Sequence, residues 1–380
     1  MLDRVNKQMA LIKPSGIRQF AELAAKTIGV VSLTIGEPEF DTDERIKQAT
    51  KDAIDHNETH YPLNQGILPL RKAISEYELK VNHHHYQPSE IIITNGATGG
   101  LSAIFLALLN AGDEVIIPSP MYVMYASMIQ YCQAKVVELD TTSNQYQIDK
   151  NSLEALITDK TKLIVITSPN NPTGAVLNQK SLDCVAELAL KHRLFVLSDD
   201  VYHQLSYIDL PKLCLNPLLR KQLIIAQSFS KPYAMTGFRI GYILADEPIA
   251  KVITTINSYL VTGISTFIQI GAIKAFEVDS SAMRLNYQNR RDRCFKMLEE
   301  MNLPCVKPEG AFYLFPDISE FKMDSLAFCN KALQEYKVAI VPGVFFLGEH
   351  HIRISYAVNE ADLYEGMRRL AQMVKDLRHA

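Results

Sequence analysis

The chain has 380 residues, of which 47% are hydrophobic, 21% charged and 8% aromatic, with 17 Gly and 17 Pro. This composition excludes a disordered chain, a collagen and a coiled coil, and the length predicts two, at most three, domains. The net charge of −3 offers no basic surface for nucleic acid or an anionic membrane, so we expect neither as a partner.

Residues 1–18 mix charged side chains with short apolar steps and lack the apolar core of a signal peptide. The longest apolar stretch, residues 101–109, is about half of the roughly 20 residues that a membrane-spanning helix needs. The cysteines form no C-x-x-C pair, which predicts reduced thiols rather than a disulfide framework or a zinc site. They are Cys132, Cys184, Cys214, Cys294, Cys305 and Cys329. We therefore expect a soluble, cytoplasmic protein.

The first 40 residues are too few to fold alone. We expect residues 1–40 to form an arm that packs on a smaller domain or on a partner subunit. Further on, the run His83-His84-His85 is predicted to be a solvated loop between a helix and a strand. Metal binding is the less favoured alternative, because adjacent residues rarely hold ligands in one geometry.

From residue 91 onward, short β-branched runs alternate with helical segments, which predicts a doubly wound parallel sheet covered on both faces. Strands are expected over 91–93, 115–117, 136–137, 163–167, 194–197, 223–227 and 240–244, and helices over 99–109, 121–131, 153–157 and 180–192. Only about ten residues join the last two strands, whereas a parallel crossover takes a dozen or more, so the last strand is predicted to be antiparallel. The fold class is thus α/β, with a seven-stranded, mostly parallel sheet between helices in a large domain, residues 41–275.

A second, smaller α+β domain is predicted over residues 276–380. Helices are expected over 284–301, 325–336 and 360–377, and strands over 311–315, 338–341 and 352–357. The sequence therefore predicts an arm followed by two domains.

The most informative stretch is residues 228–239, which follows a predicted strand. Lys231 then lies at the carboxyl end of that strand, where open α/β sheets bind their ligands. A lysine amine can form a Schiff base with a carbonyl cofactor, and nearby hydroxyl and guanidinium groups can hold a phosphate. Ser228, Ser230 and Arg239 supply those groups. Taken alone, an exposed loop lysine would be the commoner explanation.

A second strand end carries Asp199, with Tyr202 three residues later. If the cofactor is a pyridine, Asp199 can pair with the ring nitrogen and keep it protonated, which makes the ring an electron sink. Tyr202 can then bond to the ring hydroxylate. Taken alone, Asp199 would serve equally well as a cap for the next helix.

Three weaker signals lie at other strand ends. Asn171 lies in a rigid turn, residues 168–174, and can present its amide to a ligand. The turn over 94–100 runs into a helix whose first N–H groups can bind phosphate, and it does not match the dinucleotide pattern G-x-G-x-x-G. Tyr122 can stack on a planar ring, although a core aromatic is an equal alternative.

Together and in this order, these stretches resemble the class I/II aminotransferases, which are pyridoxal-phosphate (PLP) enzymes of the aspartate aminotransferase fold type, fold type I. The resemblance runs from residues 32–40 to residues 353–357. Its most specific part is the block S-x-S-K-x-x-x-M-T-G-x-R over 228–239, supported by N-P-T-G and S-D-x-x-Y. Residues 15–18, 32–40 and 137–143 are most similar to a subgroup from Gram-positive bacteria that is associated with N-acetyl-diaminopimelate transamination.

The resemblance implies a role for each of these residues around PLP. Lys231 is the Schiff-base lysine and moves the proton, and Asp199 pairs with the pyridine nitrogen. Tyr202 and Asn171 contact the ring oxygen, and Tyr122 stacks on the ring. The implied phosphate contacts are Ala97, Thr98, Ser228, Arg239 and, as an additional contact, Ser230.

The resemblance also implies how substrate and partner are bound. Arg353 grips the substrate α-carboxylate, with Asn171 and the backbone at Gly36 nearby. Tyr61 matches the tyrosine that reaches the phosphate site of the neighbouring subunit, which implies a homodimer with shared active sites. Thr98 stands where some aspartate aminotransferases place a lysine, and residues 342–353 are shorter than in relatives.

The expected activity is transfer of an amino group from an L-amino acid to a 2-oxo acid such as 2-oxoglutarate, by a ping-pong mechanism. N-acetyl-diaminopimelate, aromatic and aspartate-like substrates are the candidates. The alternatives are a PLP-dependent β-lyase acting on cystathionine-like thioethers and, less favoured, a non-catalytic PLP-binding regulator.

Overall fold

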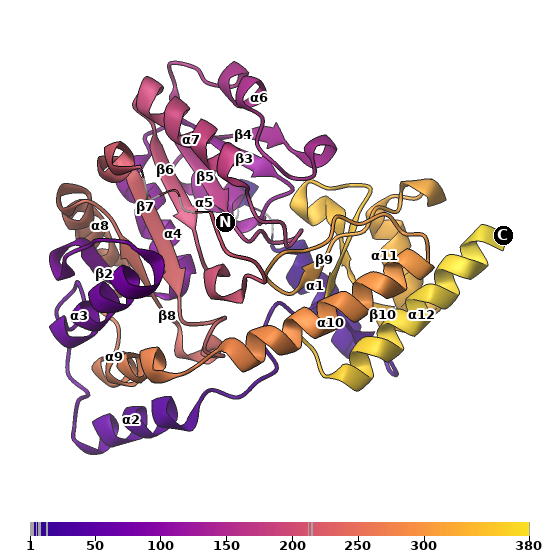
Figure 1. Ribbon diagram of the computed structural model, residues 1–380, viewed down its shortest axis with the longest axis horizontal. Helices are drawn as coiled ribbons and strands as arrows, with labels where there is room; N and C mark the ends of the chain where they lie inside the picture. Colours follow the sequence, from indigo (N-terminus) through magenta and orange to yellow (C-terminus); the bar gives the residue numbers. More distant parts are fainter. Residues whose placement is uncertain are drawn as a thin grey trace.

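The computed structural model describes residues 4, 6, 9–12, 14–211, 213 and 216–379. A seven-stranded sheet with the order β2-β8-β7-β6-β5-β3-β4 forms the centre of its larger part (Figure 1). The strands are β2 (Ile91–Asn95), β3 (Glu114–Ser119), β4 (Lys135–Asp140), β5 (Thr161–Thr167), β6 (Phe195–Asp199), β7 (Leu223–Ser228) and β8 (Ile240–Leu244). β8 pairs antiparallel with β2 and β7, and the remaining pairs are parallel. The predicted α/β fold is confirmed, including the antiparallel last strand.

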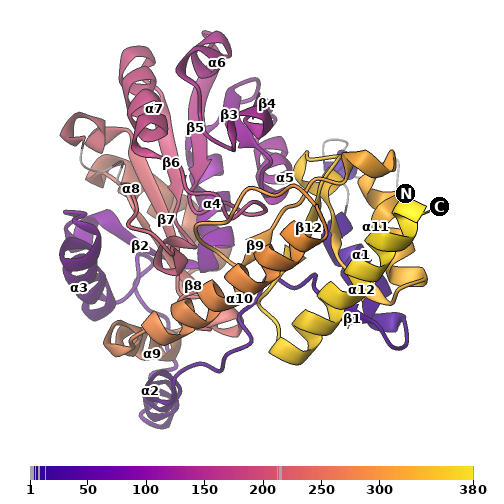
Figure 2. The same cartoon turned by 45° about the vertical axis from the view of Figure 1, so that its right-hand side comes forward.

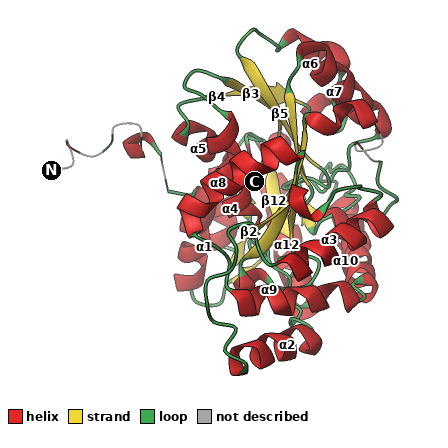
Figure 3. Cartoon of the chain, turned by 90° about the vertical axis from the view of Figure 1, so that its left-hand side faces the viewer, coloured by secondary structure: helices red, strands yellow, loops and turns green. Residues whose placement is uncertain are grey.

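Both faces of this sheet are buried, which explains the unbroken β-branched runs. Alternate residues of β2 enter different apolar clusters: Ile91 and Ile93 pack with residues of α3 and α7, and Ile92 packs with residues of α4 and α8. Figure 3 shows helices on either side of the strands. The helices are α2 (Glu44–Asp55), α3 (Leu68–Tyr77), α4 (Gly96–Leu108), α5 (Met124–Tyr131), α6 (Lys150–Ala155), α7 (Gln179–His192), α8 (Glu247–Val261) and α9 (Thr266–Ile273).

The C-terminal part contains a smaller antiparallel sheet with the order β11-β12-β9. Its elements are α10 (Ser281–Glu300), β9 (Tyr313–Leu314), α11 (Ser325–Gln334), β10 (Val338–Ala339), β11 (Val341–Pro342), β12 (Ile352–Ser355) and α12 (Glu360–His379). The single strand predicted over 338–341 is wrong. The strand is interrupted at Ile340, because β11 pairs with β12 while β10 pairs with another segment.

That other segment is β1 (Val31–Ser32), which lies parallel to β10. It follows α1 (Gly16–Lys26), and Figure 2 shows both elements beside the C-terminal helices. Phe20 and Leu33 belong to the same apolar cluster as Phe328 of α11 and Leu370 of α12. The division of the chain at residues 40 and 275 remains a prediction.

The histidine run is not uniformly solvated. His83 and His85 are exposed, but His84 is buried and its Nδ1 lies 2.8 Å from a carboxylate oxygen of Glu78. The prediction of a solvated loop is therefore wrong for His84, because the turn after α3 directs it into the protein.

Two further findings concern the cysteines and the apolar character of the helices. Among the described residues, five cysteines are free, and Cys214 lies outside the described residues. Within the same part of the chain, none of the helices is long and apolar enough to cross a membrane.

Candidate active site

The carboxyl ends of the parallel strands bring the predicted site residues to one edge of the sheet. Asp199 ends β6 and pairs in register with Ala226 of β7, the strand that Lys231 follows. Asn171 follows β5, which lies on the other side of β6. Residues far apart in the sequence therefore meet where open α/β sheets bind ligands.

Lys231 is a largely buried amine. Its Nζ donates a hydrogen bond to the carbonyl oxygen of Gly36 at 2.6 Å. Burial lowers the pKa of Lys231 to about 8; Glu37 opposes this shift, and the positive charges of Arg239 and Arg353 add to it. A lysine with a lowered pKa has more of the neutral, nucleophilic form near neutral pH.

Asp199 is a buried carboxylate with one oxygen bonded and one free. Tyr125 donates its hydroxyl to Oδ2 at 2.5 Å, and the same hydroxyl lies 2.7 Å from Oγ1 of Thr167. Oδ1 is buried and has no hydrogen-bond partner among the described residues. Burial raises the pKa of Asp199 to about 6, the Tyr125 bond lowers it, and the charge of Asp200 raises it. An unpaired buried acceptor of this kind suits a ligand that brings a donor.

Two glycines allow a close approach at the start of α4. A Cβ atom on Gly96, which has φ +62°, would lie 2.9 Å from Nη2 of Arg239. A Cβ atom on Gly241 would lie 2.9 Å from the backbone nitrogen of Ala97. Free N–H groups at a helix start bind anions, and Ala97 and Thr98 stand in the first turn of α4. The arrangement is suited to a phosphate.

The predicted serines lie at the end of β7 beside Lys231. Ser228 and Ser230 are both buried. The Ser228 hydroxyl oxygen accepts a hydrogen bond from the backbone N–H of Ser230 at 3.1 Å. This bond closes a tight turn at the end of β7, directly before Lys231.

Arg353 extends into the site from β12, and its guanidinium group contacts residues of four other segments. Nη1 donates to Oδ1 of Asn171 at 3.0 Å, and Nη2 donates to the carbonyl oxygen of Thr34 at 2.8 Å. Its guanidinium carbon lies 4.5 Å from the ring centre of Tyr313 and 4.9 Å from that of Phe346. Nε is buried, and no described residue accepts a hydrogen bond from it. A guanidinium fixed in this way can still offer a planar fork to a carboxylate.

The two predicted aromatic contacts, Tyr202 and Tyr122, are both close enough to this arginine for its charge to affect their pKa values. The hydroxyl of Tyr202 is 2.8 Å from that of Tyr313. Tyr122 lies in the loop before α5, so the helix predicted from residue 121 is wrong in its start. The backbone N–H of Met121 is bonded instead to the carbonyl oxygen of Phe346 at 3.0 Å, which holds this loop against the C-terminal part. Burial raises the pKa of Tyr122 to about 12, and the nearby charges include Asp199 and Arg353.

Tyr61 stands apart from this constellation. Its side chain is 88% exposed, and among the described residues no hydrogen bond joins it to the other predicted site residues. It lies beside a hollow formed by residues 59–62 and by Gly263, Ser265, Thr266 and Phe267. Its role toward a neighbouring subunit remains a prediction.

The sequence reasoning missed three side chains at this site: Tyr125, Tyr313 and Phe346. Tyr125 had a weak signal, because it comes three residues after Tyr122 and a buried tyrosine hydroxyl needs a partner. Tyr313 and Phe346 had none, since the hydrogen bond between Tyr202 and Tyr313 spans 111 residues and Phe346 reaches the site only through its contact with Arg353.

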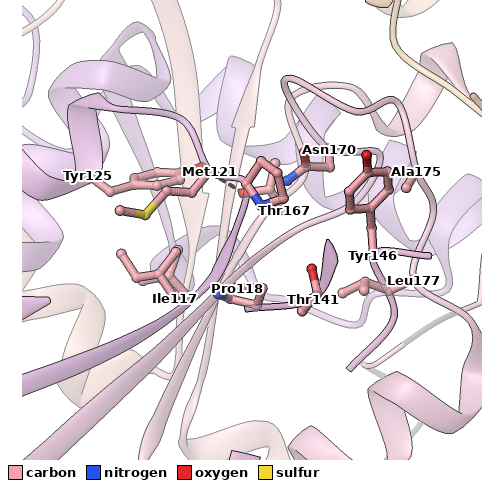
Figure 4. A pocket seen from close by; sticks show the side chains of 12 residues that line it. Ile117, Pro118, Met121, Tyr125, Thr141, Tyr146, Thr167, Asn170, Ala175 and Leu177 are labelled. Carbon is pink, nitrogen blue, oxygen red and sulfur yellow. Dashed lines mark hydrogen bonds between the residues drawn. The ribbon is translucent and has the colours of Figure 1, made fainter. Parts of the chain in front are cut away.

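A small hollow adjoins the Tyr125–Thr167 hydrogen bond. Figure 4 shows Met121, Tyr125, Thr167, Asn170 and Tyr146 around it, at the carboxyl ends of β3 and β5. The edge of the sheet next to Asp199 is therefore not completely filled by protein side chains.

Comparison with known proteins agrees with this geometry. Residues 28–370 match the family described as aminotransferase class I and II. The chain is 41% identical to a probable N-acetyl-LL-diaminopimelate aminotransferase of Bacillus subtilis (strain 168), over 99% of this chain and 97% of the relative. It is 39% identical to aromatic-amino-acid aminotransferase 2 of Thermococcus litoralis, over 98% of each chain. Its fold is similar to that of the aspartate aminotransferase from Thermus thermophilus with maleate, with a TM-score of 0.93, 32% identity, and coverage of 97% and 99%.

Proposed function

The chain belongs to the class I and II aminotransferases, and on that premise we propose that it transfers an amino group from an L-amino acid to a 2-oxo acid such as 2-oxoglutarate, by a ping-pong mechanism. The observation that carries the proposal is that one edge of the sheet holds both Asp199, whose buried Oδ1 has no hydrogen-bond partner among the described residues, and Lys231, a buried amine of lowered pKa. Oδ1 of Asp199 can accept a hydrogen bond from a protonated pyridine nitrogen, and the neutral amine of Lys231 can react with an aldehyde. A pyridine aldehyde would therefore satisfy both groups.

Enzymes of this family use PLP, and the residues present fit that group. Oδ1 of Asp199 has no hydrogen-bond partner in the part of the chain that the structure describes, which suits a protonated ring nitrogen. The start of α4 and Arg239, brought together by Gly96 and Gly241, suit the phosphate. When bound, PLP supplies an electron sink next to the substrate Cα.

We assign the proton transfer to Lys231. Its Nζ would take the proton from the substrate Cα and deliver it to C4′ of the bound cofactor within the first half-reaction, and it would move a proton in the opposite direction in the second. Its pKa of about 8 lies near the pH at which a general base works well. Tyr202 and Asn171 would contact the ring oxygen, and Tyr122 would stack on the ring.

We assign substrate binding to Arg353. The rings of Tyr313 and Phe346 and the carbonyl of Thr34 orient the guanidinium before any substrate arrives. A preoriented planar fork binds a carboxylate with two parallel hydrogen bonds. Asn171 and the backbone at Gly36 lie next to this position through their bonds to Arg353 and Lys231.

The names of relatives support three substrate classes: N-acetyl-diaminopimelate, aromatic amino acids and aspartate. Arg353 would bind only the α-carboxylate, which all three substrate classes share, so it does not distinguish among them. The side-chain pocket therefore decides among them.

We also propose a cytoplasmic homodimer with shared active sites, built from an arm (1–40), a large domain (41–275) and a small domain (276–380). Exposed apolar side chains support the dimer: Tyr61 is 88% exposed, Leu63 67% and Tyr259 86%. The segment of Tyr61 lies against the start of α9 and the loop after α8, since the Thr266 hydroxyl donates to the carbonyl oxygen of His60 and a Cβ atom on Gly263 would lie 3.0 Å from Pro62. Clustered exposed apolar residues mark interfaces.

The visible absorption spectrum tests the function. Purified protein with PLP should show a band that shifts when single donors are added and returns with 2-oxoglutarate. The Lys231→Ala variant, which cannot form the covalent link, should lose the band. Release of pyruvate and ammonia from a thioether without any 2-oxo acid would instead support the β-lyase. A band unmoved by every donor would favour a regulator, and no band in the wild type would refute the proposal.

A further inference from the structure

A cluster of buried polar side chains lies between the segment after α3 and β8. The only sign of it in the sequence was the unusual run of three histidines, residues 83–85. Glu78, directly after α3, is 0% exposed. One carboxylate oxygen lies 2.9 Å from the side-chain nitrogen of Asn82 and 2.8 Å from Nδ1 of His84, and the other accepts the hydroxyl of Tyr242. Burial raises the pKa of Glu78, but these bonds outweigh it and hold the pKa below its ordinary value. We call these four residues the Glu78 cluster.

Stability alone does not explain this cluster. A buried carboxylate costs free energy, and well-packed apolar side chains of similar size are often as stable or more so. Its place in the fold is informative instead, because it links the end of α3 to β8. β8 pairs with β7, the strand that leads to Lys231 (Figure 1).

One contact leads from the cluster to the segment of Tyr202. The ring of His84 is parallel to that of His203, with centres 6.5 Å apart and an interplanar angle of 4°. His203 follows Tyr202 directly, and its backbone N–H bonds to the carbonyl of Asp200 at 2.9 Å. The turn that carries Tyr202 therefore lies beside His84, whose ring is bonded to Glu78.

A second contact joins the segments of Lys231 and Tyr202. Tyr233 lies two residues after Lys231, and its hydroxyl accepts a hydrogen bond from Nε2 of Gln204 at 3.1 Å. Burial raises the pKa of Tyr233 to about 12, and the negative charge of Glu78 is among the groups that raise it further. Tyr233 thus lies within electrostatic reach of the cluster as well.

We propose that the Glu78 cluster and the Tyr233–Gln204 pair position the two segments that would contact the cofactor, residues 200–205 and 229–235. The inference rests on the proposed function. Glu78 and Tyr233 act through the backbone on Tyr202 and Lys231, so they are positioning residues. Their removal should loosen both segments together and leave the Arg353 side of the site unchanged.

The first test compares Tyr233→Phe with Tyr364→Phe. Tyr233→Phe removes the acceptor of Gln204, whereas the hydroxyl of Tyr364 has no partner among the described residues. Hydrogen–deuterium exchange of the cofactor-free protein should be about fivefold faster over 200–206 and 229–236 in Tyr233→Phe, as expected for one lost hydrogen bond. The PLP dissociation constant should rise by about the same factor. The control should change neither.

The second test uses Glu78→Gln. Three donors converge on Glu78, and a glutamine would place its own amide donor against one of them, so at least one bond is lost. The same two segments should exchange faster, kcat should fall, and the KM for the amino donor should stay unchanged. If Glu78→Gln does not fold, Tyr233→Phe decides.

Two results would overturn the inference. Unchanged exchange and PLP affinity in Tyr233→Phe would show that the pair positions nothing. A uniform increase in exchange that includes residues 339–357 would show a merely structural role. Because the exchange is measured without cofactor, a wild type that fails to bind PLP would refute the proposed function while this comparison remains decisive.

Discussion

The hydrogen bond from Tyr125 to Asp199 allows a quantitative test of the site. Folding raises the pKa of Asp199 from 3.8 to about 6, chiefly through burial. Between these values the native state binds more protons than the unfolded chain, so stability falls as the pH rises from about 4 to about 6. A difference of about two pH units corresponds to about 3 kcal/mol.

Tyr125→Phe removes a donor that favours the ionised carboxylate. A hydrogen bond to a charged group contributes about 1.5–3 kcal/mol, so the pKa of Asp199 should rise further, to about 7–8. The fall in stability should then continue to about pH 8. Below about pH 5 Asp199 is protonated in both native proteins, so the ionisation contributes no difference there.

The assay is calorimetric unfolding of cofactor-free protein at several pH values, together with PLP titrations. At pH 7 the ionised fraction of Asp199 should fall from about 90% to about 10–50%, so the affinity for PLP should drop about twofold to tenfold and recover toward pH 9. Thr167→Val is the matched control, because it removes the other partner of Tyr125 and keeps the bond to Asp199. Identical pH profiles for wild type and Tyr125→Phe would refute the reasoning.

Three further predictions concern other parts of the site. In cofactor-free protein, the acylation rate of Lys231 measured by mass spectrometry should titrate near pH 8, because burial lowers its pKa; a midpoint near 10.5 would contradict this. Arg353→Lys should raise the KM for the amino donor about tenfold, since lysine cannot form the planar fork, with an unchanged PLP dissociation constant; equal loss of both affinities would contradict the assignment. Gly241→Ala should lower the free energy of unfolding by about 1–3 kcal/mol in denaturant titrations, because its Cβ would lie 2.6 Å from the carbonyl of Gln227; an unchanged midpoint would show that β7 and β8 separate easily.

The sequence by itself was sufficient for the sheet and for the side chains at the strand ends. A strand buried on both faces is apolar along most of its length, so β5 and β7 each contain an unbroken apolar run bounded by polar residues. Because parallel strands end at the same edge, Lys231 and Asp199 could be placed together without any knowledge of packing. The short connection before β8 was likewise enough to predict its antiparallel direction.

The tertiary structure decided which residues surround those side chains. The partner of Asp199 is Tyr125, 74 residues away, and the rings beside Arg353 come from two other segments. The burial of His84 depends on Glu78, and the break at Ile340 depends on pairing with β1 and β12. Such contacts depend on how distant segments pack, and no local pattern of hydrophobicity or turn residues encodes that packing. The direction of β8 followed from the length of the connection before it, which the sequence shows directly. The surroundings of a buried charged group depend instead on segments from the whole fold.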